Sequence, residues 1–169
     1  MLITIREAIA ADAEQVIAHV KRLALEPDRM ILHAPGEFQV TVEQERALST
    51  EYAASDNSTY LVAEVEGYVV GILSCQGSKR QANHHTASLG ISVERERRGC
   101  GVGTALMETL VTWAHTTSVI QRLELSVFAH NAPAIRLYQK FGFVEEGRHH
   151  KAYWRDGHFI DSLTVARLL

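Results

Sequence analysis

The sequence contains little that would tie the chain to a membrane, a disulfide framework or a metal. Its 169 residues include two cysteines, Cys75 and Cys100, which form neither a disulfide framework nor the spaced ligands of a metal site. No stretch approaches the roughly 20 apolar residues of a membrane span. The N-terminus lacks the charged and then apolar layout of a signal peptide. We therefore expect a cytoplasmic protein with no metal and no membrane partner.

An excess of positive charge is also absent. The formal net charge is −3, and the nine histidines are scattered rather than spaced as metal ligands on a helix. The one local basic patch, Arg95, Arg97 and Arg98, is too small to indicate a nucleic-acid partner. Apolar residues make up 46% of the chain and charged residues 22%, as in ordinary globular proteins. Length and composition together predict a single domain over residues 1–169.

Hydrophobic periodicity and turn residues predict alternating strands and helices. Helices are expected at Ala13–Leu25 with Asp12 as N-cap, from the Thr41–Gln44 capping box to about Ala54, at Gly103–Thr116 and at Ala132–Phe141. Strands are expected at Leu2–Arg6, Thr59–Glu66, Tyr68–Gln76, His85–Val93 and Arg122–Phe128. Phe143–Gly147 starts a further strand, and Lys151–Trp154 and Phe159–Leu168 flank a hairpin turn at Arg155–His158.

The expected order is β-α-α-β-β-β-α-β-α-β-β. This order predicts an α/β (α+β) fold, a mixed and mostly antiparallel twisted sheet flanked by helices on both faces. The strands at His85–Val93 and Arg122–Phe128 should run parallel, because a helix connects them.

The strongest local signal is the glycine-rich segment Arg98–Gly103, between a strand and a helix. Glycines allow positive φ angles and a close approach of the backbone to a ligand, and a helix N-terminus attracts phosphate. A Walker loop would need Gly-Lys-Ser/Thr, but Thr104 follows Gly103 directly. A dinucleotide fingerprint would need a third glycine, which is missing. The segment therefore indicates an anion-binding loop of another kind, or only a tight turn.

A second constellation begins at Asn131, which can cap the next helix, with Pro133 in the first turn and Gly142 beyond the end. Tyr138 lies seven residues after Asn131, close to two helical turns, so both side chains can share one face. The alternative for Tyr138 is a half-buried aromatic residue of the core.

The two constellations together resemble the GCN5-related N-acetyltransferase (GNAT) family. The Arg/Gln-x-x-Gly-x-Gly/Ala phosphate loop of that family is matched by Arg98-x-x-Gly101-x-Gly103, and its later helix by Asn131 and Ala134 through Phe143. The resemblance implies the GNAT acyl-CoA N-acyltransferase fold, a V-shaped opening between two parallel strands, and acetyl-CoA as cosubstrate. The residues implied to bind acetyl-CoA are Ile91, Ser92, Val93, Arg98, Gly99, Cys100, Gly101, Val102, Gly103, Thr104, Asn131, Ala134 and Tyr138.

The implied reaction is direct attack of a primary amine on the thioester within a ternary complex. A backbone N–H of Ile91 or Val93 could stabilise the oxyanion, and Tyr138 would protonate the departing thiolate. Many relatives place a glutamate on the strand before the loop as general base, but 84–91 contains no carboxylate. Glu124 and His85 are the substitutes, or a water chain suffices. The missing glutamate favours α-amines, whose pKa of about 8 is below that of lysine.

The acceptor is not named by the sequence. Resemblance favours a free amino acid or another small amine, and the alternatives are a protein N-terminus, a ribosomal protein, or a non-catalytic acyl-CoA-binding regulatory module. The acceptor walls in this family come from the first loop, 26–38 here, and from the late hairpin. Glu26, Asp28 and Glu37 could attract a cationic amine, although loop carboxylates are more often only solvated. The family also favours a homodimer, with Tyr153, Trp154 and Phe159 either in the interface or in the core.

Overall fold

The structure, a computed structural model, describes residues 2–169, and its strands and helices follow the predicted order. The helices are α1 (Ala13–Ala24), α2 (Val42–Ala53), α3 (Val102–Thr117) and α4 (Ala132–Lys140), with short 3-10 helices η1 (Ala10–Asp12), η2 (Gln81–Asn83) and η3 (Arg95–Arg97). The strands are β1 (Thr4–Glu7), β2 (Thr59–Val65), β3 (Tyr68–Gly77), β4 (Thr86–Val93), β5 (Arg122–Phe128), β6 (Val144–Arg155) and β7 (His158–Leu168).

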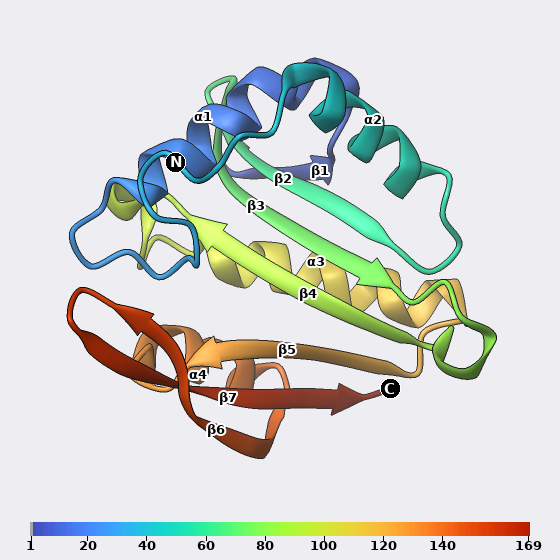
Figure 1. Cartoon of the computed structure of the whole chain (residues 1–169). Helices are drawn as coiled ribbons and strands as arrows, with labels where there is room; N and C mark the ends of the chain where they lie inside the picture. The colour runs from blue at the N-terminus through green and yellow to red at the C-terminus, as the bar shows by residue number, and fades with distance from the viewer. Residues whose placement is uncertain (1) are drawn as a thin grey trace.

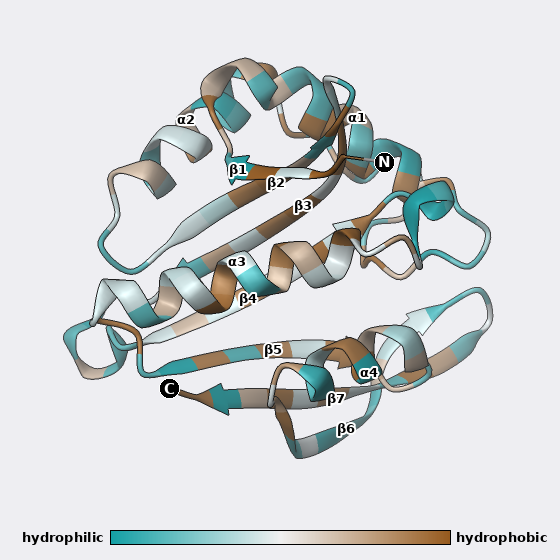
Figure 2. Ribbon diagram, turned by 180° about the vertical axis from the view of Figure 1, so that it is seen from behind, coloured by the Kyte–Doolittle hydropathy of each residue, from teal (hydrophilic) through white to brown (hydrophobic). Residues whose placement is uncertain are grey.

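The seven strands form one sheet in the order β1-β2-β3-β4-β5-β7-β6. Every neighbouring pair is antiparallel except β4 and β5, which are parallel as predicted. Figure 1 shows α1 and α2 over the β1–β3 half of one face, and Figure 2 shows α3 and α4 on the opposite face. The predicted mixed sheet with helices on both faces is therefore confirmed.

Each face of the sheet has its own apolar core, because successive strand residues point to opposite sides. Leu61, Ala63 and Leu73 pack with Leu106 and Leu110 of α3 in the larger core. The smaller core lies under α1 and α2, where it contains Val16, Tyr52, Tyr60, Val62 and Val69. On the face that α1 and α2 cover, these helices do not extend over the β5 and β7 half of the sheet (Figure 1).

The hairpin turn predicted at Arg155–His158 is confirmed, and a turn of the same kind joins β2 to β3. Glu66 and Gly67 have φ angles of 52° and 83°, and Asp156 and Gly157 have 51° and 85°. Two successive positive φ angles are typical of the type I′ turn, whose twist matches that of the flanking strands. The second turn places Arg155 beside His158 at the tip of the β6–β7 hairpin.

The two predicted helix caps have different outcomes. The Thr41 capping box is confirmed, with the Gln44 N–H donating to Thr41 Oγ1 and the Thr41 N–H to Gln44 Oε1. Asp12 lies at the N-cap position of α1, as predicted, but its side chain makes no cap hydrogen bond to the helix. The chain already enters a helical turn at Ala10, so the Asp12 carboxylate instead accepts from Arg6 and from the Ile9 N–H.

The last strands differ from the sequence prediction in one respect. The segments expected at 143–147 and 151–154 are parts of the single strand β6. The register slips between His149 and Tyr153, where Lys151 has a φ of 52°. Asp161 of β7 supports this bulge, since its carboxylate accepts from the Lys151 N–H and from Arg148. A bulge breaks the alternation of apolar residues, which explains the interruption in the pattern.

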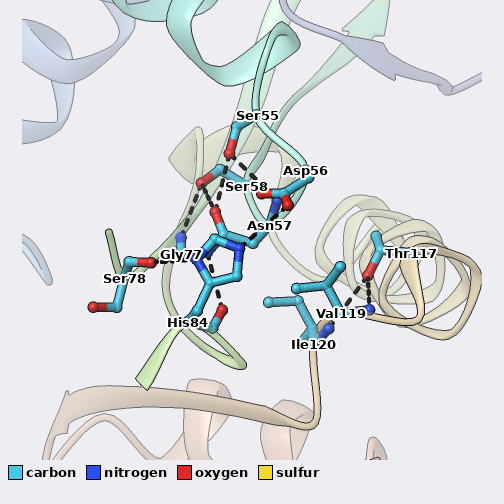
Figure 3. A network of polar contacts seen from close by, with 10 residues as sticks. All are labelled: Ser55, Asp56, Asn57, Ser58, Gly77, Ser78, His84, Thr117, Val119 and Ile120. Carbon is cyan, nitrogen blue, oxygen red and sulfur yellow. Dashed lines mark hydrogen bonds and ion pairs between the residues drawn. The ribbon is translucent and has the colours of Figure 1, made fainter. Parts of the chain in front are cut away.

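The end of the sheet where β4 begins is held together by a polar network (Figure 3). The side-chain amide of the buried Asn57 donates to the carbonyls of Ser78 and His84, each at 3.0 Å. His84 also faces Asp56, which raises the pKa of His84 through a hydrogen bond. The carbonyl of His85 then accepts from Gln121 and Arg122, which joins the starts of β4 and β5.

Candidate active site

The two parallel strands separate beyond their first residues. Only Thr86, Ala87 and Ser88 of β4 pair with β5, in register with Arg122, Leu123 and Glu124. Further along, β4 stays paired with β3 up to Val93, and β5 with β7 up to Phe128. Figure 1 shows the two strands diverging toward their carboxyl ends. The V-shaped opening expected from the resemblance is present, and the backbone edge of β4 from Leu89 to Val93 faces it.

The predicted glycine loop follows directly from the open end of β4. Gly99 and Gly101 have φ angles of 74° and 90°, and Gly101 is the N-cap of α3 with no side-chain cap. The first-turn N–H groups of α3 therefore lack intrahelical partners and carry the positive end of the helix dipole. Glycine at position 103 is favoured by packing instead, since a Cβ there would lie 3.2 Å from Leu137 Cδ2 of α4. The loop thus offers backbone donors to an anion and lets α4 pack closely.

Arg98 and its neighbour Arg95 are held by the chain that follows α1. Two Arg98 hydrogen bonds reach both carboxylate oxygens of Glu26, at 2.9 and 2.7 Å, and a third reaches the Val93 carbonyl. Arg95 forms an ion pair with Asp28 at 2.8 Å. Glu26 and Asp28 are therefore ion-pair partners of the glycine loop and of η3 before it, and Glu37 accepts from the Ala34 N–H. The three carboxylates considered as attractants for an amine have internal partners.

The second constellation lies on α4, on the side of the opening formed by β5. Asn131 caps α4, with its Oδ1 accepting from the Ala134 N–H at 3.3 Å, as predicted. Tyr138 is buried and its ring lies 5.8 Å from that of Phe143. Burial raises the pKa of Tyr138 above its ordinary value of 10.0, so the hydroxyl stays protonated. Within residues 2–169, that hydroxyl has no hydrogen-bond partner.

Both candidate bases lie near the closed end of the split between β4 and β5. Glu124 lies in register with Ser88 at the last paired position of β4 and β5, and its carboxylate accepts from Arg122 Nε at 2.7 Å. His85 precedes β4 at the closed end of the sheet and is exposed. Ile91 lies six residues further on, about 20 Å away along an extended strand. The geometry brings Glu124 closer to the opening than His85.

Ser92 is linked to a buried histidine that the sequence did not single out. His19 of α1 is fully enclosed, and its Nε2 lies 3.0 Å from Ser92 Oγ. Burial, together with the charges of Arg22 and Arg98, lowers the pKa of His19 to about 4. His19 is therefore neutral at physiological pH and positions Ser92 against α1. Its Nδ1 is enclosed with no hydrogen-bond partner in the described part of the chain.

The loop after α1 reaches the β6–β7 hairpin on the far side of the opening. Arg155 donates from Nη1 to the Arg29 carbonyl at 2.6 Å, and its guanidinium lies 5.1 Å from the centre of the Phe128 ring. Phe128 also contacts Tyr153 and stacks with His130. Sequence reasoning named neither Arg29 nor Arg155 as a site residue, because the two lie 126 positions apart.

Among residues 2–169, no group of three or more His, Cys, Asp or Glu side chains is arranged to hold a metal ion. Nor does any helix in the same range have the length and apolar character to cross a membrane.

Comparisons with known proteins agree with this geometry. The model of the acetyltransferase (GNAT) family matches residues 24–143. The L-amino acid N-acetyltransferase AaaT of Escherichia coli is 34% identical over 92% of this chain and 99% of its own length. An N-alpha-acetyltransferase of Sulfurisphaera tokodaii is 30% identical over 92% and 90%. A GNAT-family acetyltransferase structure from Streptococcus pneumoniae has a TM-score of 0.95 and 30% identity, covering 99% of both chains.

The matched family model and the shared fold place the chain in a class of acyl-transferring enzymes. The chain belongs to the GNAT family and is an N-acetyltransferase. The fold class inferred from the sequence is confirmed.

Proposed function

We propose that the protein transfers the acetyl group of acetyl-CoA to the amino group of a free amino acid or a similar small amine. The observation that carries the proposal is the opening between β4 and β5, with the glycine loop 98–103 following β4 and helix α4, which contains Tyr138, following β5. The resemblance of the whole chain to the E. coli L-amino acid N-acetyltransferase supports the substrate class.

In this proposal, acetyl-CoA lies along the open edge of β4. The N–H groups from Gly99 to Thr104 hold its pyrophosphate, because the loop glycines and the start of α3 leave them unpaired. Backbone groups of 91–93 contact the pantetheine arm. The Asn131 amide nitrogen is free to contact the arm as well, since only its oxygen serves as the cap. Arg98 contributes by holding the loop in place through Glu26.

The amine then attacks the thioester carbonyl directly. The new C–N bond forms as the C–S bond breaks, the sulfur leaves with the bonding electrons, and the amine loses one proton. A backbone N–H of Ile91 or Val93 stabilises the oxyanion. Tyr138 gives its proton to the departing thiolate, and its raised pKa keeps that proton available at all physiological pH values. Glu124, through water, is the favoured acceptor of the amine proton over His85.

One of the two alternative functions has support of its own. Acetylation of a protein N-terminus or ribosomal protein is favoured by the S. tokodaii relative and by a ribosomal-protein-alanine N-acetyltransferase structure from Brucella melitensis (28% identity, TM-score 0.84, covering 98% and 99% of the two chains). A non-catalytic acyl-CoA-binding module is disfavoured by the presence of both Asn131 and Tyr138.

One assay separates the three functions. Thiol release from acetyl-CoA is followed with the twenty L-amino acids, polyamines and N-terminal peptides, and the products are identified by mass spectrometry. We expect turnover with L-amino acids and an N-acetyl product. Turnover confined to peptides would replace the small-molecule proposal, and acetyl-CoA binding without turnover on any amine would indicate the regulatory module.

A further inference from the structure

Two arginines share one half-exposed carboxylate at the mouth of the opening. Arg29 Nη1 and Arg155 Nε each lie 3.7 Å from Asp156 Oδ2, too far for a hydrogen bond. The two guanidinium side chains are only 12% and 13% exposed, whereas that of Asp156 is 58% exposed. Two nearly buried cations with one loose counter-ion are an unbalanced arrangement, since buried charges are normally paired.

The side-chain N–H groups of Arg29 and Arg155 have few hydrogen-bond partners among residues 2–169. Arg29 Nε is enclosed and has no hydrogen-bond partner in residues 2–169. The only hydrogen bond that Arg155 makes there uses Nη1 and goes to the Arg29 backbone carbonyl. Burial and the charge of Arg29 both lower the pKa of Arg155, as expected where two cations face each other without enough negative charge. Five N–H groups in a planar fork fit a carboxylate in a bidentate way, so an anionic group would complete the site.

The pair lies where an acceptor would enter. Loop 26–38 is fixed on one side to the phosphate loop, through Glu26 with Arg98 and Asp28 with Arg95. On its other side, Arg29 meets Arg155 of the β6–β7 hairpin. Figure 1 shows this loop beside the carboxyl end of β4, with the tip of the β6–β7 hairpin nearby. The arginines therefore sit at the open end of the split, between its two walls.

Residues next to Arg29 and Arg155 connect this pair to the end of the opening where α4 begins. Arg155 stacks on Phe128, the last residue of β5, which precedes the α4 cap Asn131 by three residues. Phe128, Tyr153 and His130 add an aromatic wall next to the two cations. A ligand here would meet positive charge at one end and aromatic rings alongside, which is the chemistry of an amino acid with an apolar side chain.

We propose that Arg29 and Arg155 form a clamp for the α-carboxylate of the acceptor amino acid. This inference rests on the proposed function and deepens it, because the clamp would select free amino acids over amines that have no carboxylate. A phosphate of acetyl-CoA presents similar anionic oxygens, so the experiment has to separate the two ligands.

The test compares matched substrates, L-leucine with L-leucinamide and L-phenylalanine with L-phenylalaninamide, across a range of pH that accounts for the lower amine pKa of the amides. For the wild type we expect the free acids to be preferred. Arg29→Gln and Arg155→Gln should raise the KM for the acids about 10- to 100-fold, the effect of losing a charged hydrogen-bond pair. The KM for acetyl-CoA, the kcat and the kinetics with the amides should stay within about twofold, since the clamp does not contact them.

Two further variants, together with a property of Arg29→Gln itself, guard against a merely structural effect. Arg29→Gln keeps the backbone carbonyl that Arg155 binds, so it removes only the guanidinium. Asp156→Asn preserves the turn, because Asn-Gly also suits a type I′ turn, and should lower or leave unchanged the KM for the acids. Arg80→Gln removes one positive charge at the other end of the sheet, before η2, and should leave all constants unchanged.

Several outcomes overturn the clamp. A parallel rise of KM for acids and amides indicates a structural role, and a rise confined to acetyl-CoA assigns the arginines to the cofactor. A wild type that acetylates amines without preferring the acids removes the clamp but keeps the proposed function. If no amine is acetylated, the proposed function fails, and calorimetry then measures the binding of L-leucine in the presence of coenzyme A. Wild-type binding that is lost in Arg155→Gln supports the clamp, and no binding by the wild type removes it.

Discussion

Tyr138 illustrates how burial sets the state of a single side chain. Its ring packs in the larger core against Phe143, and the same burial keeps the phenol protonated. A proton donor needs that state before the thiolate leaves, whereas a core aromatic would need only the ring. Tyr138 as a proton donor and Tyr138 as a core aromatic residue therefore differ only in whether the hydroxyl group is needed.

Tyr138→Phe tests that atom alone. We expect kcat to fall about 100-fold or more, the usual contribution of a general acid. The dissociation constant of acetyl-CoA and the melting temperature should stay near the wild-type values, because the ring and its packing are kept. An unchanged kcat would remove Tyr138 from the mechanism.

His19 makes a residue-scale prediction about pH. Its pKa is lowered from 6.5 to about 4 in the folded protein, mainly by burial. Between these values the unfolded chain binds the proton and the folded chain does not, so stability falls as the pH falls from 6.5 to 4. Above pH 6.5 His19 is neutral in both the folded and the unfolded chain, so no stability is lost through its protonation. The loss approaches about 3 kcal/mol at the lower limit.

Urea unfolding at pH 7 and pH 5 measures this effect. His19→Gln should lower stability at pH 7, because the contact with Ser92 is altered, but should flatten the dependence between the two pH values. Arg80→Gln, which changes an exposed side chain, provides the control. A His19→Gln protein with the same slope as the wild type would show that other groups cause the acid sensitivity.

At the scale of elements, β4 is paired with β5 at one end and separated from it at the other. The Asn57 network holds the start of β4, and Gly77 allows it, since a Cβ at Gly77 would overlap the Asn57 side chain and its carbonyl (Figure 3). The opposite end separates from β5 and leads through η3 into the glycine loop. A rigid closed end lets the split stay open without loss of the sheet.

Gly77→Ala should therefore destabilise the protein by about 2 kcal/mol or more, the scale of overpacking combined with an unsatisfied buried amide. Gly90→Ala is the matched control on the neighbouring strand, because the nearest atom to its Cβ would be Ser74 Oγ at 3.8 Å. Thermal unfolding compares the two. Equal melting temperatures would mean that Asn57 moves aside freely.

The sequence predicts elements better than it predicts the contacts between them. Glycines at 99 and 101, the Thr41 capping box and the Asp156-Gly157 turn each carry a local signal, because the backbone conformation depends on the residue itself. The insertion of β7 between β5 and β6 carries none, since strand order is set by packing across the whole sheet. The ion pairs of Glu26 and Arg29 were missed for the same reason, as their partners lie far away in the chain.

At the scale of the whole molecule, the β6–β7 hairpin has two faces with different environments. Tyr153 and Arg155 face Phe128, whereas Trp154 and Phe159 lie on the other side because strand residues alternate. Trp154 is 63% exposed and Phe159 53% exposed, and their rings meet at 4.7 Å. An exposed aromatic pair on an edge hairpin is a typical interaction surface.

We propose that this pair contributes to the homodimer expected from the family resemblance. Sedimentation velocity at micromolar concentrations should give a dimer for the wild type and a monomer for Trp154→Lys combined with Phe159→Glu. The double variant should keep its fold, because both side chains are largely in solvent, and its clamp face should be unaltered. Tyr68→Lys, at an equally exposed tyrosine (70%) at the start of β3, is the control and should leave the dimer intact. A wild type that sediments as a monomer would leave the pair without this role.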